Sequence, residues 1–563
     1  MLRSEIVRRI LEARGIAGED LEAYLSPSLR GLAAPEDLPG VVEAADVMLS
    51  AVAAGGRVVV FGDYDCDGVC ATAILVRALN ALGAKVSPFL PRRLEEGYGM
   101  SDAAVGRMLE AHPDASLVVT VDNGINSVEQ VAFLKGRGVG VVVTDHHLPG
   151  EELPSADVLV NPKVSAPPSL QGLCGSGVAY FLAHRLVSEA KRRGAYGGPN
   201  IGGPLLVMAG LATVTDVMPL LGQNRIFVSE ALRRFDRSAP VGLRELHLYA
   251  ARSGSDRYTA RDFSHLIGPR MNAAGRLASG DDALALVLAD DREEARGLAR
   301  KVDERNVQRK AIEQKMTEDA LARVVPGAAA QVIDLPEGHQ GVAGIVAARV
   351  LEHMGGTVPV CVVAAAGHGS ARAPDGVNIR DALAACSEVL HTYGGHAAAA
   401  GFSVKEGRID DFRRMLCAVC AERSQSALAV RDAVDAWIEP SDVTLELAED
   451  LQLMEPFGEG NQEPVFGMRA VAFSDVRLIG ADGRHLALTL AGSGLRAVFW
   501  GMGAEIEKFR ANRAGTYSIR FRVAISSYLD RHVEMHLFSA TPERDARMNQ
   551  FGMAIDKIAA PRS

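Results

Sequence analysis

Three apolar, β-branched runs separated by longer segments of helical pattern constrain the fold of this chain most strongly. They occupy residues 58–61, 117–121 and 139–144. Uninterrupted apolar strands of this kind are typical of parallel sheets that are buried on both faces. Their alternation with helical segments is the pattern of βαβ units. Residues 56 to about 160 are therefore predicted to form an α/β domain around a parallel sheet.

Acidic residues or histidines follow each of these runs. Because ligands of open α/β sheets gather beyond the carboxyl ends of the strands, we expect these side chains to meet at one edge. Asp216 follows an apolar helix, where stability alone would favour no charge. The other candidates are Asp63, Asp65 and Asp67 after the first run, Asp122 after the second, and His146 and His147, preceded by Asp145, after the third.

Converging carboxylates repel one another unless a cation lies among them. Taken alone, the first acidic motif could be a solvated loop, and His146 or Asp216 could be a hydrogen-bonded buried residue. The convergence of four segments favours a metal site, and oxygen ligands with imidazole suit Mg²⁺ or Mn²⁺. Two ions about 4 Å apart would clamp both oxygens of an in-line phosphoryl displacement. The predicted chemistry is therefore phosphodiester hydrolysis, and no nucleophile elbow or Walker A motif competes with it.

The rest of the chain predicts further domains. Residues 290–320 have the pattern of a long connecting helix, 330–420 alternate strands and helices again, and 464–542 resemble a small β-barrel. The expected fold is two α/β domains joined by a long helix, with a C-terminal β-barrel. The predicted segments are an N-terminal helical segment (1–50), a catalytic domain (51–289), the connecting helix (290–325), a second α/β domain (326–428), the barrel (429–545) and a tail (546–563).

Composition limits the environment and the partners. The formal net charge of −10 gives no overall basic signature, so nucleic acid would have to bind in a locally basic groove. Seven cysteines without a framework indicate a reducing compartment, and the isolated Cys417/Cys420 pair favours neither metal nor redox use. The N-terminus lacks the apolar core of a signal peptide, and residues 204–221 read as a buried helix rather than a membrane span. We expect a cytoplasmic protein without a membrane anchor.

The Asp145-His146-His147 triplet and the preceding acids resemble the DHH phosphoesterase superfamily. Residues 268–276, 341–347 and 456–461 are similar to its RecJ branch, and residues 394–401 to the DHHA1 domain. The resemblance covers almost the whole chain and makes the barrel an OB-like domain. It implies an exonuclease that degrades single-stranded DNA from the 5′ end in recombination and repair, with two Mn²⁺ or Mg²⁺ ions. The implied metal ligands are Asp65, Asp67, Asp122, His146 and Asp216, with Asp63 and His147 close by.

Two positions depart from the family pattern. Phe61 stands where relatives often carry a histidine, so one metal would have fewer protein ligands or would use Asp63 instead. Gly338-His339-Gln340 replaces the usual Trp-His-Pro, which affects local packing more than catalysis.

Several further residues are candidates for holding DNA. Arg270, Asn272 and Arg276 lie in a stretch that we expect to be too small-sided to form a helix face, which suits close approach to phosphate; an interdomain ion pair is the alternative. Glycine turns of the second α/β domain could present N–H groups, a hydroxyl and cations to a phosphate near the scissile bond. The alternative is that these turns are purely structural. In the barrel, most aromatic residues should be core, with one or two stacking on bases. The turn candidates are Ser370, Arg372, Gly395 and His396, of which His396 could also stabilise developing charge, and the aromatic candidates are Phe466, Phe499, Trp500 and Tyr528.

The sequence is compatible with two other functions. A DHH phosphodiesterase for oligonucleotides or cyclic dinucleotides would use the same chemistry but would not need the barrel. A non-catalytic scaffold should have lost metal ligands, yet the whole acidic set is present. A cleft closed by the barrel would admit a single strand and exclude a duplex. We expect a monomer that acts on single-stranded DNA, with a single-strand-binding protein or a helicase as a possible partner.

Overall fold

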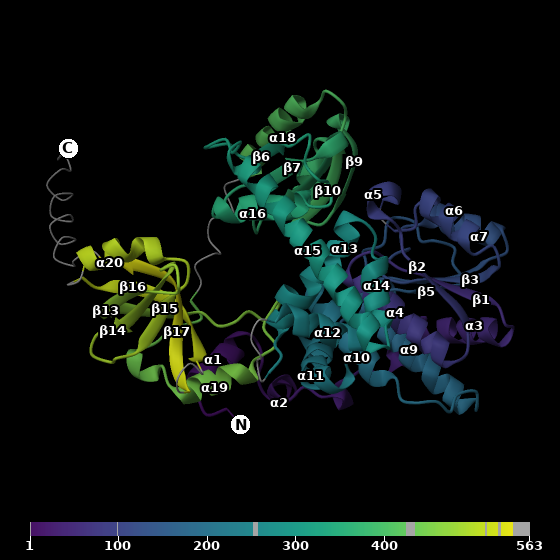
Figure 1. Ribbon diagram of the computed structural model, residues 1–563, viewed down its shortest axis with the longest axis horizontal. Helices are drawn as coiled ribbons and strands as arrows, with labels where there is room; N and C mark the ends of the chain where they lie inside the picture. The colour runs from purple at the N-terminus through teal and green to yellow at the C-terminus, as the bar shows by residue number, and fades with distance from the viewer. Residues whose placement is uncertain are drawn as a thin grey trace, which may run out of the picture. The chain divides into compact units, whose positions relative to one another are not determined.

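The computed structural model describes residues 2–97, 99–251, 257–423, 434–512, 515–526 and 531–543. The chain divides into two compact units (Figure 1). The large unit contains Pro27–Arg431 and Gly458–Gly460, and the small unit contains Met1–Ser26, Asp432–Phe457 and Asn461–Ser563.

The first sheet of the large unit has five parallel strands in the order β2-β1-β3-β4-β5. Side chains alternate between the faces of a strand, so Val58 and Val60 enter one hydrophobic cluster while Val59 and Phe61 enter another. The predicted parallel sheet, buried on both faces, is confirmed. Its strands are β1 (Arg57–Phe61), β2 (Lys85–Phe89), β3 (Ala115–Thr120), β4 (Gly140–Thr144) and β5 (Val158–Val160).

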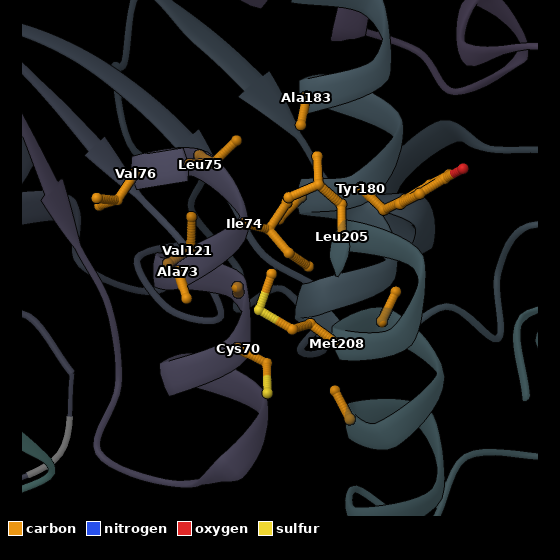
Figure 2. Close-up of a cluster of buried hydrophobic side chains, with 14 of the residues drawn as sticks. Cys70, Ala73, Ile74, Leu75, Val76, Val121, Tyr180, Ala183, Leu205 and Met208 are labelled. Carbon is orange, nitrogen blue, oxygen red and sulfur yellow. The ribbon is translucent and has the colours of Figure 1, made fainter. Parts of the chain in front are cut away.

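Helices cover both faces of this sheet. Figure 2 shows part of the larger cluster, in which Ile74 and its neighbours on α4 meet Tyr180 of α9 and Met208 of α10. The 204–221 region contains the buried helix α10, and among the described residues no helix is long and apolar enough to cross a membrane. The larger cluster takes in α3 (Val41–Ala53), α4 (Cys66–Ala81), α9 (Gly175–Arg192), α10 (Gly202–Thr215), α11 (Gly222–Ser238) and α12 (Val241–Ala250), and the other face carries α6 (Asp102–Ala111) and α7 (Val128–Gly136).

The segment 268–276 forms a helix, so the expectation that it is too small-sided for one is wrong. It lies in α13 (Gly268–Leu277), which follows a π-helical turn at Asp262–Ile267. Its small residues serve packing, because a Cβ atom on Gly275 would lie 2.4 Å from the carbonyl oxygen of Tyr64. The helix therefore approaches the acidic loop after β1 closely. After α14 (Asp281–Leu288), the 30-residue α15 (Arg292–Leu321) is the predicted connecting helix.

The second sheet of the large unit is mixed, in the order β6-β7-β8-β10-β9. Cys361, Cys386, Cys417 and Cys420 contribute to its hydrophobic cluster, and no disulfide joins any of the seven cysteines, all of which lie among the described residues. The Cys417/Cys420 pair is therefore part of a core. The elements are β6 (Gln331–Asp334), α16 (Ala343–His353), β7 (Val360–Val363), β8 (His368–Arg372), α17 (Ile379–Ala384), β9 (Leu390–Gly395), β10 (Ala399–Val404) and α18 (Ile409–Arg423).

The small unit is a seven-stranded mixed sheet in the order β11-β12-β16-β17-β15-β14-β13. The N-terminal helices α1 (Glu5–Ala13) and α2 (Glu19–Leu25) belong to this unit, and the amides of Arg3 and Ser4 donate to the Asp450 carboxylate at 2.6 Å. The predicted third, β-rich domain is confirmed. Its other elements are β11 (Ala436–Trp437), α19 (Leu445–Leu453), β12 (Phe466–Val471), β13 (Phe473–Ile479), β14 (His485–Leu490), β15 (Arg496–Phe499), α20 (Ile506–Ala511), β16 (Tyr517–Ser526) and β17 (His532–Pro542).

Candidate metal centre and nucleic-acid site

Two helix N-termini hold the acidic loop after β1. Asp65 is the N-cap of α4, and its Oδ1 atom accepts hydrogen bonds from the amides of Asp67 (2.9 Å) and Gly68 (3.0 Å). The carboxylate of Asp67 accepts from Gly175 and Ser176, both at 2.7 Å, at the start of α9. Unpaired N–H groups at helix starts favour negative charge. The local fold therefore fixes these two carboxylates before any ligand binds.

Asp122, just beyond β3, has a strained backbone. Its φ of 61° is in the left-handed region, which is uncommon for residues other than glycine and often marks a functional position. A Cβ atom on Gly175 would lie 2.6 Å from the Asp122 Cβ atom. The start of α9 thus packs directly against the side chain of Asp122.

Asp145 orients the two histidines that follow it. Its Oδ1 atom accepts from the amide of His146 (2.7 Å) and lies 2.7 Å from Nδ1 of His147, while Oδ2 accepts from the amide of Ile125 (3.0 Å). Burial works against protonation of His147, but the Asp145 hydrogen bond and charge outweigh it, so the pKa of His147 lies above its usual value. Asp145 therefore acts as the support of the histidines, a role that the triplet alone did not reveal.

The predicted ligands come together in three overlapping groups, within each of which the ligand atoms lie within 4.8 Å of one another. Asp122 and His146 each belong to two groups. The group of Asp122, His146 and His147 therefore links the other two, an arrangement that suits neighbouring cation positions. The groups are Asp63, Asp65 and Asp122; Asp122, His146 and His147; and Asp67, His146 and Asp216.

The unsatisfied atoms of this cluster fit divalent metal ions. Oδ1 of Asp63, Oδ1 of Asp122 and both ring nitrogens of His146 are buried without a hydrogen-bond partner. Burial, followed by the charges of neighbouring carboxylates, raises the pKa values of Asp63, Asp122 and Asp216 well above normal. Burial also lowers the pKa of His146 to about 4. Carboxylates and a neutral imidazole are the donors that Mn²⁺ and Mg²⁺ accept.

Phe61 is part of a hydrophobic cluster and offers no ligand atom. Its buried ring packs against Phe89 with 5.0 Å between ring centroids. The strand position where relatives often carry a histidine is therefore part of the hydrophobic core.

Three arginines gather next to the acidic loop. Burial and the charge of Arg93 lower the pKa of Arg276 to about 10, and the same two causes lower the pKa of Arg372. Arg93, in the short helix α5 (Arg93–Glu96), lies 5.2 Å from the ring centroid of Tyr64. A Cβ atom on Gly344 would lie 2.9 Å from Arg372 and 3.4 Å from the Ser370 hydroxyl. The cationic cluster of Arg93, Arg276 and Arg372 thus lies beside the first turn of α16. Arg93 was not predicted, because nothing local marks it.

The other candidates of α13 make contacts within the protein. Arg270 pairs with Asp303 of α15 at 2.7 Å and donates to the carbonyl of Leu266. The carboxamide oxygen of Asn272 accepts from the amide of Cys66 at 2.7 Å and so supports the acidic loop. A cavity of about 260 Å³ lies between Asn272, Arg276, Arg309 and the two residues that flank Asp216, Thr215 and Val217.

His396 occupies the turn between β9 and β10. Its backbone N–H donates to the carbonyl oxygen of Ala399 at 2.8 Å. A Cβ atom on Gly395 would lie 2.6 Å from that oxygen. Burial lowers the pKa of His396, and the charges of Lys163 and His147 add to the effect. His396 is therefore within electrostatic reach of the metal cluster.

The aromatic candidates of the small unit separate into core and surface residues. Phe466 and Phe499 are buried, whereas Trp500 is 53% exposed; Tyr528 lies outside the described residues. Two aromatic residues not predicted, Trp437 and Phe538, are also exposed, and each has an arginine over its ring. The guanidinium carbons of Arg469 and Arg522 lie 4.4 and 5.7 Å from the ring centroids of Trp437 and Phe538, respectively.

Comparisons with known proteins match the chain along most of its length. Residues 57–202 match the DHH family, N-terminal domain; residues 327–422 the DHHA1 domain; and residues 434–537 the RecJ OB domain. The single-stranded-DNA-specific exonuclease RecJ of Thermus thermophilus is 38% identical over 508 residues, covering 88% of this chain and 72% of that protein. Crystal structures of Thermus thermophilus RecJ with Mn²⁺ and with Mg²⁺ superpose with TM-scores of 0.80 and 0.74 at 33% and 31% identity. Both cover 96% of this chain, and 76% and 75% of theirs.

Proposed function

The chain belongs to the RecJ family of DHH phosphoesterases, and on that basis we propose that it is a metal-dependent exonuclease that degrades single-stranded DNA from the 5′ end in recombination and repair. The observation that carries the proposal is the shared use of Asp122 and His146 by adjacent ligand groups. Two divalent ions at neighbouring positions can clamp the entering and leaving oxygens of an in-line phosphodiester hydrolysis.

Each ligand group has a defined part in the proposed mechanism. Mn²⁺ or Mg²⁺ bound there would polarise the phosphodiester and stabilise the entering and leaving oxygens. Asp63, Asp65 and Asp122 would hold one ion, and Asp67, His146 and Asp216 the other. Asp122 would also serve the second ion, since its Oδ1 atom lies 3.0 Å from Nε2 of His146. Asp145 keeps His147 oriented and favours its protonated form. His147 and His396 therefore present imidazole groups near the scissile phosphate, where hydrogen bonds can stabilise developing negative charge.

The cationic cluster would hold the DNA backbone next to the metal centre. Arg93, Arg276 and Arg372 repel one another in a partly buried setting, so a phosphate would relieve that repulsion and accept bidentate hydrogen bonds. The Ser370 hydroxyl and the backbone at Gly395 would add donors. Arg270 and Asn272 would position α13 and the acidic loop, since their side chains are already engaged.

The exposed aromatics of the small unit would stack on bases of the same strand. Base stacking on aromatic side chains contributes about 1–3 kcal/mol per base and tolerates any sequence. Trp437, Trp500 and Phe538 are the candidates. A phosphodiesterase specific for dinucleotides or cyclic dinucleotides would have no use for such a platform, and a non-catalytic scaffold would not need the complete ligand set.

The proposed setting is the cytoplasm, with the chain acting as a monomer. Single-stranded ends are exposed by helicases and covered by single-strand-binding proteins, so these are the proposed partners.

Digestion of labelled oligonucleotides tests the proposal. With Mn²⁺, wild-type chain should release a 5′ label from single strands before a 3′ label and leave matched duplex intact, while EDTA should stop the reaction. Asp65→Asn should be inactive, and Asp410→Asn, whose side chain is 77% exposed on α18, should behave as wild type. Cleavage of dinucleotides alone would favour the small-substrate function, and no cleavage of any substrate would favour the scaffold.

A further inference from the structure

The segment 456–461, one of the sequence motifs with no part in the chemistry above, contacts the chain four residues beyond Asp216. Its central part, Gly458–Gly460, belongs to the large unit, whereas the residues on both sides of it belong to the small unit. The backbone N–H of Leu220 donates to the carbonyl of Glu459 at 2.7 Å. This hydrogen bond joins the segment to the turn that follows Asp216.

Two glycines permit the close approach. A Cβ atom on Gly458 would lie 2.7 Å from Cδ1 of Leu220, and one on Gly460, whose φ is +67°, would lie 3.1 Å from Cβ of Pro219. Leu220 is buried. A side chain at either glycine would therefore push against Pro219 and Leu220.

The turn after Asp216 has a backbone conformation that needs support. Val217 has a φ of +56°, which is a clear outlier for a β-branched residue. The amides of Val217 and Met218 donate to the carbonyls of Val214 (3.3 Å) and Thr213 (3.1 Å). This is the Schellman pattern of helix ends, in which glycine usually occupies the position of Val217. Such strain persists only where neighbouring structure holds it.

The segment is also fixed at its C-terminal end, within the small unit. The carboxamide nitrogen of Asn461 donates to the carbonyls of Met454 and Pro456, both at 2.8 Å, and its oxygen accepts from the Tyr24 hydroxyl at 2.7 Å. Asn461 is buried. These hydrogen bonds fix the end of the motif that belongs to the small unit.

We propose that Gly458–Gly460 is a positioning segment of the metal centre. By holding Pro219 and Leu220, it keeps Val217 in the left-handed conformation and the Asp216 carboxylate beside His146, where Oδ2 lies 3.6 Å from Nε2. The inference rests on the proposed function only in taking Asp216 as a metal ligand. The 456–461 motif would then support the Asp216 ligand, and this role does not depend on any contact with DNA.

Mn²⁺ binding to the full chain, measured by calorimetry without DNA, tests the inference. Gly460→Ala should weaken binding by about tenfold, the lower end of the effect expected for groups that orient metal ligands. Gly494→Ala is the matched control, because Gly494 has a φ of +70° and no atom near its Cβ position; it should bind Mn²⁺ as wild type does. Gly458→Ala tests the contact without strain, since Gly458 has an ordinary φ, and should also weaken binding. Thermal unfolding without metal checks that each variant is folded.

A double-mutant cycle separates positioning from general loss of structure. If the segment acts through Asp216, Gly460→Ala should cause no further loss of Mn²⁺ affinity in an Asp216→Ala background. Val217→Gly removes the strain and should restore Mn²⁺ affinity to the Gly460→Ala chain. Unchanged affinity in both glycine variants, an equal loss in both backgrounds, or no restoration by Val217→Gly would each overturn the inference. A wild-type chain that bound no Mn²⁺ would instead contradict the proposed function.

Discussion

Nε2 of His146 lies 3.0 Å from Oδ1 of Asp122 without the geometry of a hydrogen bond, and the imidazole is neutral because burial lowers its pKa to about 4. The surrounding carboxylates would by themselves favour protonation of the ring, so burial is the effect that prevails. A neutral imidazole in this position is a donor for a metal ion.

His146→Asn should change the preference between metals. The variant replaces an imidazole nitrogen by an amide oxygen, and nitrogen ligands favour Mn²⁺ over Mg²⁺. Mn²⁺-supported cleavage of single-stranded DNA should fall by at least about tenfold, or ~1.4 kcal/mol, and by more than Mg²⁺-supported cleavage. Rates measured with each metal over a range of concentrations check this. Equal losses with both metals would argue against His146 as a ligand.

Metal removal should make stability depend on pH. Burial raises the pKa values of Asp63, Asp122 and Asp216. Their stabilising contribution to the free energy of unfolding is therefore complete below about pH 4 and is lost as pH rises through the raised pKa values. His146 acts in the opposite direction: its contribution is present above about pH 6.5 and is lost toward its folded pKa of about 4. In EDTA, the free energy of unfolding should therefore decrease as pH rises above about 4, because the three carboxylates outweigh the single imidazole.

Denaturant unfolding in EDTA at several pH values, repeated with Mn²⁺, measures this effect. Bound metal should remove most of the decrease, because it compensates the carboxylate charges. A decrease of the same size with and without Mn²⁺ would show that these carboxylates do not bind the ion.

Arg276 and Arg270 should differ in their effect on DNA binding. Arg276 belongs to the cationic cluster, whereas Arg270 is paired with Asp303 at 2.7 Å. Arg276→Ala should weaken binding of single strands in EDTA and lower the slope of log affinity against log salt by about 0.7, the value for one phosphate contact. Arg270→Ala should leave the slope unchanged and lower thermal stability, and Arg414→Ala, on the surface of α18, is the neutral control. A reduced slope for Arg270→Ala would place that residue on DNA.

Tryptophan fluorescence can report on the small unit alone. The chain has two tryptophans, and both Trp437 and Trp500 are exposed there. Oligo(dT) in EDTA should quench their emission, and Trp437→Ala should weaken affinity by roughly 1–3 kcal/mol if a base stacks on it. Trp437→Phe keeps an aromatic surface and serves as the control. Unchanged emission at saturating oligonucleotide would show that neither indole contacts bases.

The local sequence was enough to predict those site residues that directly follow one strand. The β1, β3 and β4 strands are continuous apolar runs, so their ends and the acids beyond them could be located without the structure. The placement of Arg93 and the close approach of α13 to the acidic loop depend on long-range packing instead. Only glycine fits at position 275, because the backbone of Tyr64 lies against it, and no local sequence pattern encodes that contact. The membership of α1 in the small unit likewise rests on contacts such as Ser4 with Asp450, 446 positions away.

Mn²⁺ stoichiometry and cleavage in wild type and Asp122→Asn test the central claim most directly. Asp122 belongs to both the carboxylate group and the histidine group, so the substitution should disturb both cation positions. We predict two Mn²⁺ ions per wild-type chain by calorimetry, and in Asp122→Asn weakened binding of both with at least about 100-fold slower cleavage, or ~2.7 kcal/mol of transition-state stabilisation. An Asp122→Asn chain that bound two ions with wild-type affinity and cleaved single strands at the wild-type rate would contradict the shared-ligand centre.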